Sequence, residues 1–120
     1  MIRVLLVDDN TEYAGVFGLM LNWQPDIEVV GIAGTLAEAR QMLEGVDVAI
    51  LDRVLPDGDG LELISKLHEA SHEAKVLVMS AIPQLVNTQE VLEAGADRML
   101  DKIAPQDKVF ATIRELGTGD

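Results

Sequence analysis

The alternation of short apolar runs with stretches of helical periodicity is the feature that most constrains the fold of this chain. Five apolar runs recur along the sequence and have the composition of β-strands. We predict strands at residues 2–7, 27–33, 46–51, 76–79 and 98–100. The first, third and fourth runs are nearly continuous in Val, Ile and Leu, as in strands that are covered on both faces of a parallel sheet.

The segments between these runs place apolar residues at intervals of three and four, the spacing of a helix with one buried face. Helices are predicted over residues 13–21, 36–43, 61–70, 84–94 and 106–116. Capping-box spacing at Thr35 and Glu38, and again at Asp59 and Glu62, supports two of the starts. Five strand–helix alternations with right-handed crossovers predict a doubly wound α/β fold, a five-stranded parallel sheet with helices on both faces.

Composition is consistent with one globular domain. The chain has 120 residues, 48% of them hydrophobic, which is enough for a core. We expect a single domain over 1–120, with 117–120 as a frayed tail or the start of a linker. A formal net charge of −12 disfavours direct binding to nucleic acid or anionic membranes. The absence of cysteine excludes disulfides and thiolate metal ligands. The N-terminal apolar run ends at Val7, too short for a signal peptide or a membrane span, so a cytoplasmic domain is expected.

Polar residues follow the predicted strands at their carboxyl ends. Asp8 and Asp9 follow the first strand and Asp52 the third, while Ser80 and Lys102 follow the fourth and fifth. Because parallel strands present these ends at one edge of the sheet, the five side chains are expected in one crevice. One acid or hydroxyl alone would be explained as a helix cap. Five at strand ends indicate a functional site.

Asp8, Asp9 and Asp52 are expected to form a metal site within this crevice. Three clustered carboxylates repel one another unless a cation lies between them. Carboxylate and water oxygens suit magnesium, with manganese as an alternative. With the metal present, a free oxygen of Asp52 is able to attack a phosphoryl group. Ser80 would donate a hydrogen bond to that group and Lys102 would supply a point positive charge.

Four segments of the chain together resemble a response-regulator receiver domain of two-component signalling: VLLVDDN, VAILDRVLPDGDG, VLVMSA and GADRMLDK. The match covers essentially the whole chain, with the motifs in order and at the family's spacing. The resemblance implies a flavodoxin-like sheet with strand order 2-1-3-4-5. It also implies that Asp52 is the phosphoacceptor, that Asp8 and Asp9 hold magnesium, and that the backbone carbonyl of Val54 completes the metal shell.

The resemblance further implies how such a domain works. Ser80 is the implied switch hydroxyl, and Lys102 contacts the phosphoryl oxygens. The implied donor is a phosphohistidine on a sensor histidine kinase or a histidine phosphotransfer protein. Phosphorylation then changes the binding of an output domain or a target protein. Such a domain assists only its own phosphorylation and dephosphorylation, so no metabolic enzyme activity is expected.

Three positions depart from the family pattern. Met99 stands where the family usually has a Tyr or Phe that rotates inward with the switch hydroxyl, so a flexible methionine takes the place of the aromatic switch residue. Ile103 stands where proline, often cis, is common; we expect a trans bond because a cis bond before a non-proline residue costs about 3 kcal/mol. Val54 is apolar where many relatives are polar, and is expected to hinder attack of water on an acyl phosphate.

Other motifs receive ordinary structural interpretations. The run at 57–60 is not an EF-hand loop, because Leu61 and His68 stand where oxygen ligands are required, and a turn leading into a helix cap is expected. His68 and His72 are expected to face solvent. Trp23 is expected to pack within the protein rather than to form a platform for a ligand.

Two other functions remain open. A receiver-like docking module that works without phosphorylation is suggested by Met99 and Ile103. A phosphatase of a Rossmann-like class would require a nucleophile and a general acid two residues apart, whereas Asp8 and Asp9 are adjacent. No glycine-rich nucleotide-binding motif follows the first strand, which disfavours a dinucleotide or nucleoside triphosphate as ligand.

Overall fold

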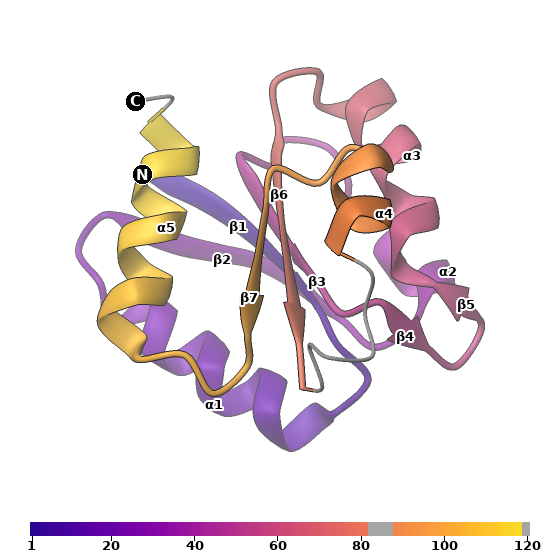
Figure 1. Ribbon diagram of the computed structural model, residues 1–120. Helices are drawn as coiled ribbons and strands as arrows, with labels where there is room; N and C mark the ends of the chain where they lie inside the picture. Colours follow the sequence, from indigo (N-terminus) through magenta and orange to yellow (C-terminus); the bar gives the residue numbers. More distant parts are fainter. Residues whose placement is uncertain (82–87, 119–120) are drawn as a thin grey trace.

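A five-stranded parallel sheet forms the centre of the protein (Figure 1). The computed structural model describes residues 1–81 and 88–118. The sheet has the order β2-β1-β3-β6-β7. Its strands are β1 (Ile2–Val7), β2 (Ile27–Ala33), β3 (Val48–Leu51), β6 (Lys75–Ser80) and β7 (Arg98–Asp101). Since β6 and β7 are the fourth and fifth strands of this sheet, the predicted order 2-1-3-4-5 is confirmed.

Helices cover both faces of the sheet, as predicted. Figure 1 shows α1 (Thr11–Asn22) and α5 (Gln106–Thr118) on one face. The opposite face carries α2 (Leu36–Ala39), α3 (Leu63–Ala70) and α4 (Thr88–Glu93). Because crossovers between parallel strands are right-handed, a connecting helix lies on one face when the chain moves in one direction along the sheet. It lies on the other face when the chain moves in the opposite direction. Because all five strands are parallel, their carboxyl ends lie at one edge of the sheet.

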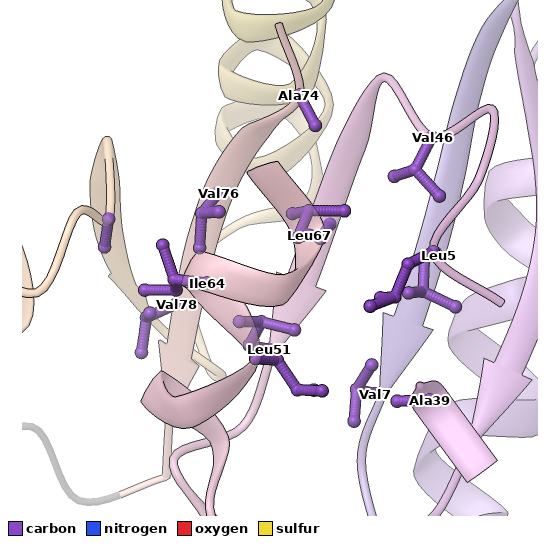
Figure 2. Close-up of a cluster of buried hydrophobic side chains, with 14 of the residues drawn as sticks. Leu5, Val7, Ala39, Val46, Leu51, Ile64, Leu67, Ala74, Val76 and Val78 are labelled. Carbon is purple, nitrogen blue, oxygen red and sulfur yellow. The ribbon is translucent and has the colours of Figure 1, made fainter. Parts of the chain in front are cut away.

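Each central strand sends alternate side chains into two separate hydrophobic clusters. From β1, Leu5 and Val7 pack beneath α2 and α3, whereas Val4 and Leu6 pack beneath α1 and α5. Figure 2 shows the first cluster, in which Leu5 and Val7 lie among side chains from β3, β6 and α3. Burial of one such side chain contributes about 1.5–3 kcal/mol. Burial on both faces explains why these strands are apolar throughout.

The second helix is shorter than predicted. The helix expected over 36–43 ends at Ala39, and the chain continues as a tighter turn. There the amide of Gln41 donates to the carbonyl of Glu38 and that of Met42 to the carbonyl of Ala39, at 3.1 and 2.9 Å. Here backbone hydrogen bonds join residues three apart in place of the α-helical bonds between residues four apart, and helix ends commonly tighten in this way.

A short hairpin follows β3 and was not predicted. It pairs β4 (Val54–Leu55) with β5 (Gly58–Asp59) in antiparallel orientation. The expected turn into a helix cap is confirmed within it: Asp59 caps the 3₁₀ turn η1 (Gly60–Glu62), and the Glu62 side chain accepts from the Asp59 amide. Each strand of this hairpin has only two residues, which is too few to give a strand pattern in the sequence.

The last two helices differ from prediction at their ends. Residues 84–87 of the helix predicted over 84–94 lie outside the described part of the chain, and α4 is described from Thr88 to Glu93. Helix α5 continues past the predicted end at 116 to Thr118, whose hydroxyl donates to the carbonyl of Arg114 at 2.8 Å. In the described ranges, no helix has the length and apolar character needed to cross a membrane.

Several surface expectations were wrong. Trp23, expected to pack, is 76% exposed, and Val16, an apolar residue of the helix predicted over 13–21 with one buried face, is 60% exposed. Leu21 is fully buried, and at about 100° per residue Trp23 lies near the opposite side of the helix. His68 is half-buried rather than solvent-facing, because its Nε2 donates to the carbonyl of Ala74 at 3.0 Å. His72 is exposed, as expected.

Candidate functional site

The carboxyl edge of the sheet brings Asp8, Asp9, Asp52 and Lys102 together. Backbone pairing continues past the strands, with the Asp8 amide bonded to the Ala33 carbonyl and the Asp52 amide to the Val7 carbonyl, each at 2.9 Å. One carboxylate oxygen from each of the three aspartates lies within 4.8 Å of the others. Asp8 is buried, Asp52 is half-buried and Asp9 is exposed. The three acids therefore open toward solvent on the side of Asp9.

Lys102 joins two of these acids. Its ammonium lies 2.5 Å from Asp8 Oδ2 and 3.1 Å from Asp52 Oδ2. Burial of this side chain would lower its pKa, but the hydrogen bonds to Asp8 and Asp52 outweigh burial and leave the pKa raised. The two acids therefore favour the charged form of the lysine.

Backbone amides hold the other oxygens of the same two acids. The Asn10 amide donates to Asp8 Oδ1 at 2.9 Å, and the Val54 amide donates to Asp52 Oδ1 at 3.2 Å. Each carboxylate is thus fixed from two sides, which restricts its rotation. The side chain of Val54 is 75% exposed beside Asp52. The backbone carbonyl of Val54 as a metal ligand stays a prediction.

Ser80 and Met99 lie on neighbouring strands of the same edge. Ser80 ends β6 and is buried, and its carbonyl accepts the Lys102 amide at 2.9 Å. Met99 is half-buried in β7 and packs against the cluster beneath α3 and α4. The Thr88 hydroxyl, at the start of α4, lies 3.9 Å from the Met99 sulfur. The predicted switch roles of both residues stay predictions.

The residue after Lys102 agrees with expectation. Ile103 is 86% exposed. No cis peptide bond occurs in the described ranges, so the expected trans bond before Ile103 is confirmed.

Sequence reasoning missed Tyr13, which lies against Lys102. The ammonium is 4.8 Å from the centroid of the Tyr13 ring. Burial raises the pKa of Tyr13, the charge of Lys102 opposes this shift, and the charges of Asp8 and Asp52 add to it. The sequence does contain a signal for this contact, because a helix that begins directly after the acidic pair places its first aromatic residue beside the strand ends. The spacing of apolar residues in this helix, by contrast, indicates only a buried face.

Arg53 was also missed, although it follows Asp52 directly. Its Nε lies 3.0 Å from Asp59 Oδ2, and its guanidinium forms a second ion pair with Glu90 of α4. These two contacts raise the pKa of Arg53, Glu90 more than Asp59. The loop that carries Asp52 is therefore tied to α4 as well as to its own hairpin.

Gly60 allows this loop to close. A Cβ at this position would lie 2.1 Å from the backbone carbonyl oxygen of Asp52 and 3.4 Å from the Cα of Arg53. The Gly60 amide donates to the carbonyl of Arg53 at 2.7 Å. Only glycine permits so close an approach of two backbone segments.

The arrangement has a definite chemical capacity. Three carboxylates supply hard oxygen ligands of the kind that magnesium and manganese bind. A fixed carboxylate beside an ammonium group, with such a cation bound, would be able to act as an oxygen nucleophile toward an anionic electrophile. Of the three acids, Asp52 is the one that contacts both Lys102 and a backbone amide and is also partly exposed to solvent.

Comparison with known proteins gives one consistent result. The sequence model of one protein family, the response regulator receiver domain, matches residues 4–114 of the chain. The chain is 36% identical to the transcriptional regulatory protein UhpA of Escherichia coli strain K12, with 99% of this chain and 60% of the relative aligned. It is 31% identical to the oxygen regulatory protein NreC of Staphylococcus carnosus, with 98% and 56% aligned. The chain thus spans a little over half the length of these relatives.

Solved structures agree in fold. The response regulator domain of Thermotoga maritima CheB superposes with a TM-score of 0.83 at 26% identity, covering 100% of this chain and 98% of that one. The beryllofluoride-activated NtrC4 receiver domain dimer gives a TM-score of 0.86 at 26% identity, covering 99% and 98%.

Proposed function

The chain belongs to the response regulator receiver family of two-component signalling, and on that premise we propose that Asp52 accepts a phosphoryl group from a phosphohistidine. The donor is a sensor histidine kinase or a histidine phosphotransfer protein. The position of Asp52 carries the proposal: one oxygen meets the Val54 amide and the other the Lys102 ammonium, beside Asp8 and Asp9. A carboxylate held in this way presents its nucleophilic oxygen in a fixed direction.

A divalent cation completes the proposed site. Asp8, Asp9 and Asp52 offer oxygens close enough together for one ion, and their hard donors fit magnesium or manganese. The backbone carbonyl of Val54 is the proposed additional ligand. When bound, the cation neutralises charge on the phosphoryl oxygens.

The proposed reaction is an in-line displacement at phosphorus. A carboxylate oxygen of Asp52 attacks, a P–O bond forms, and the P–N bond of the phosphohistidine breaks, with its electron pair leaving on the imidazole nitrogen. The product is an acyl phosphate on Asp52. Lys102 offsets charge on the phosphoryl oxygens, and the Ser80 hydroxyl donates a hydrogen bond to one of them. The exposed side chain of Val54 hinders the approach of water and slows hydrolysis.

The phosphorylated domain acts as a signalling switch in the cytoplasm. The shift of Ser80 toward the phosphoryl group alters the packing of Met99, which touches Thr88 at the start of α4. The population of two conformations then changes, and with it the partner that the domain binds.

An output domain or target protein reads this switch. The relatives are named as regulators, and one, DevR/DosR of Mycobacterium tuberculosis, as a DNA-binding transcriptional activator; the present chain aligns with 56% of it. A receiver with a net charge of −12 leaves contact with nucleic acid to other parts of such a protein.

Phosphorylation from acetyl phosphate with magnesium tests the proposal. Intact-mass spectrometry should show one added phosphoryl group on the wild-type chain, and none on Asp52→Asn or in the presence of a chelator. Asp107→Asn changes an exposed acid of α5 outside the site and should be phosphorylated as the wild type is. Phosphorylation of Asp52→Asn at the wild-type rate would exclude Asp52 as the acceptor.

A second measurement separates the switch from a docking module that needs no phosphorylation. Beryllofluoride with magnesium should move backbone amide resonances from Asp52 as far as Met99. Shifts confined to the acidic site would favour the docking module.

A further inference from the structure

We propose that Tyr13 is a positioning residue whose ring keeps the ammonium of Lys102 beside Asp52 when a divalent cation occupies the carboxylates. This inference rests on the proposed function and adds a residue to it. Lys102 acts on the phosphoryl group, and Tyr13 acts through Lys102.

The ammonium of Lys102 lies against two acids and one aromatic ring. Asp8 and Asp52 contact it through carboxylate oxygens, and the face of Tyr13 lies 4.8 Å away, within the roughly 6 Å range of a cation–π interaction. The Lys102 side chain is only 14% exposed. Partial removal from water strengthens the attraction between a cation and a ring.

The ring is held by contacts that do not involve Lys102. The Tyr13 amide donates to the side-chain oxygen of Asn10, the N-cap of α1, at 3.1 Å. The ring packs against Phe17, one helical turn later, with centroids 5.7 Å apart and planes at 44°. Tyr13 therefore provides a fixed surface to which the flexible lysine can bind.

Tyr13 and Lys102 also line a common pocket of about 440 Å³ between α1 and α5. Its other walls are largely apolar and include Met20, Met79 and Val109. If the ring were replaced by a smaller side chain, this space would widen on the side where Lys102 lines it. The lysine would then gain conformations that point away from Asp52.

Cation binding explains why such a surface is needed. Two of the three carboxylates that a cation would use are the two that hold Lys102. A cation on these oxygens repels the ammonium and removes its hydrogen-bond partners. The ring carries no charge and offers no ligand oxygen on its face, so its contact with Lys102 is compatible with the bound cation. Tyr13 thus keeps Lys102 in place during the interval before a phosphoryl group arrives.

The test compares Tyr13→Phe, which keeps the ring, with Tyr13→Leu, which does not. Two quantities are measured at saturating magnesium: the ring-current shift of the Lys102 ε-methylene protons, and the affinity for beryllofluoride. Tyr13→Phe should retain the upfield shift and bind beryllofluoride within about twofold of wild type. Tyr13→Leu should lose the shift and bind on the order of fivefold more weakly. Trp23→Leu removes an exposed aromatic side chain at the end of the same helix and should leave both quantities close to wild type.

A double-mutant cycle separates positioning from a structural effect. In a Lys102→Ala background, Tyr13→Leu should weaken beryllofluoride binding no further. Equal affinity of wild type and Tyr13→Leu, or an unchanged loss in the Lys102→Ala background, would overturn the role of Tyr13 and leave the proposed function intact. Failure of the wild type itself to bind beryllofluoride would overturn the proposed function, and the role of Tyr13 with it.

Discussion

The ammonium of Lys102 lies 2.5 Å from Asp8 Oδ2, an ion pair between residues that are 94 positions apart in the chain. The same ammonium lies 3.1 Å from Asp52 Oδ2. Both acids are also members of the group that offers oxygens for a metal. We therefore expect a divalent cation to compete with the lysine for these ligands before phosphorylation, and to cooperate with it once phosphoryl oxygens are present.

Removal of this lysine should separate metal binding from phosphorylation. In Lys102→Met the competing charge is absent, so magnesium affinity measured by titration calorimetry should rise roughly three- to tenfold. Phosphorylation by acetyl phosphate should nevertheless slow by about 10- to 100-fold, because a charge that stabilises the transition state is lost. Lys108→Met, on the exposed surface of α5, should change neither quantity. Unchanged or weaker magnesium binding in Lys102→Met would argue against the competition.

Gly60 should be intolerant of a side chain. Its Cβ in Gly60→Ala would lie 2.1 Å from the Asp52 carbonyl oxygen, so the loop that carries Asp52 must move. We expect the free energy of unfolding, measured by denaturant titration, to fall by about 1–3 kcal/mol. Beryllofluoride binding should fall with it. Gly15→Ala is the matched control, because a Cβ there meets nothing within 4 Å and an exposed helical position should gain about 0.5–1 kcal/mol. A Gly60→Ala protein as stable as wild type would contradict the close approach.

Asp57 should make stability depend on pH in the acid range. It accepts the amides of Leu36 and Ala37 at 2.8 and 3.1 Å, and so caps α2 from the hairpin. The Leu36 amide is the main cause that holds its pKa below the ordinary value. A lowered pKa in the folded state adds stability above the unfolded pKa, and this stability is lost as pH falls through the folded pKa.

The comparison of wild type with Asp57→Asn across acid pH measures this contribution. The difference in unfolding free energy should be largest near neutral pH and should shrink toward strongly acidic pH. Glu73→Gln, an exposed loop acid, serves as the control for a general change of charge. A difference that stays constant with pH would show that the carboxylate charge of Asp57 has no part in the cap.

The Arg53–Glu90 ion pair should steady α4. Arg53 follows Asp52 directly, and Glu90 lies on the helix whose first residue touches Met99. In Glu90→Gln, amide hydrogen exchange across the described residues of α4 should become up to about fivefold faster. The free energy of global unfolding should fall by less than about 1 kcal/mol. Exchange in α3 should not change. Glu93→Gln alters an acid of the same helix that accepts from Gln89, and should have a smaller effect. Uniform exchange changes in α3 and α4 would contradict a local link.

Much of the fold could be predicted because burial on both faces leaves a clear record in the sequence. Val4 to Val7 are all nearly inaccessible, so the strand pattern is continuous and its assignment unambiguous. Parallel strands share one edge for their carboxyl ends, and because β1 lies next to β3 this brings Asp8, Asp9 and Asp52 together. The site follows from topology before any contact is known.

The remainder depends on contacts that leave no local pattern. The end of α2 at Ala39 reflects a change in backbone hydrogen bonding that residue spacing does not reveal. Trp23 is exposed because of the rotational position of α1, which apolar character alone does not determine. Tyr13 and Arg53 contact groups far away in the sequence, so their connection to the site appears only in three dimensions.

The central claim, that Asp52 carries the phosphoryl group, is tested most directly by reductive trapping. Wild-type protein is treated with acetyl phosphate and magnesium, reduced with borohydride, digested and mapped by mass spectrometry. Hydride reduction of an aspartyl phosphate leaves homoserine at the modified position. Homoserine should be found at position 52 and at no other aspartate, and only when magnesium is present. Homoserine at position 8 or 9, with an unmodified Asp52, would contradict the account.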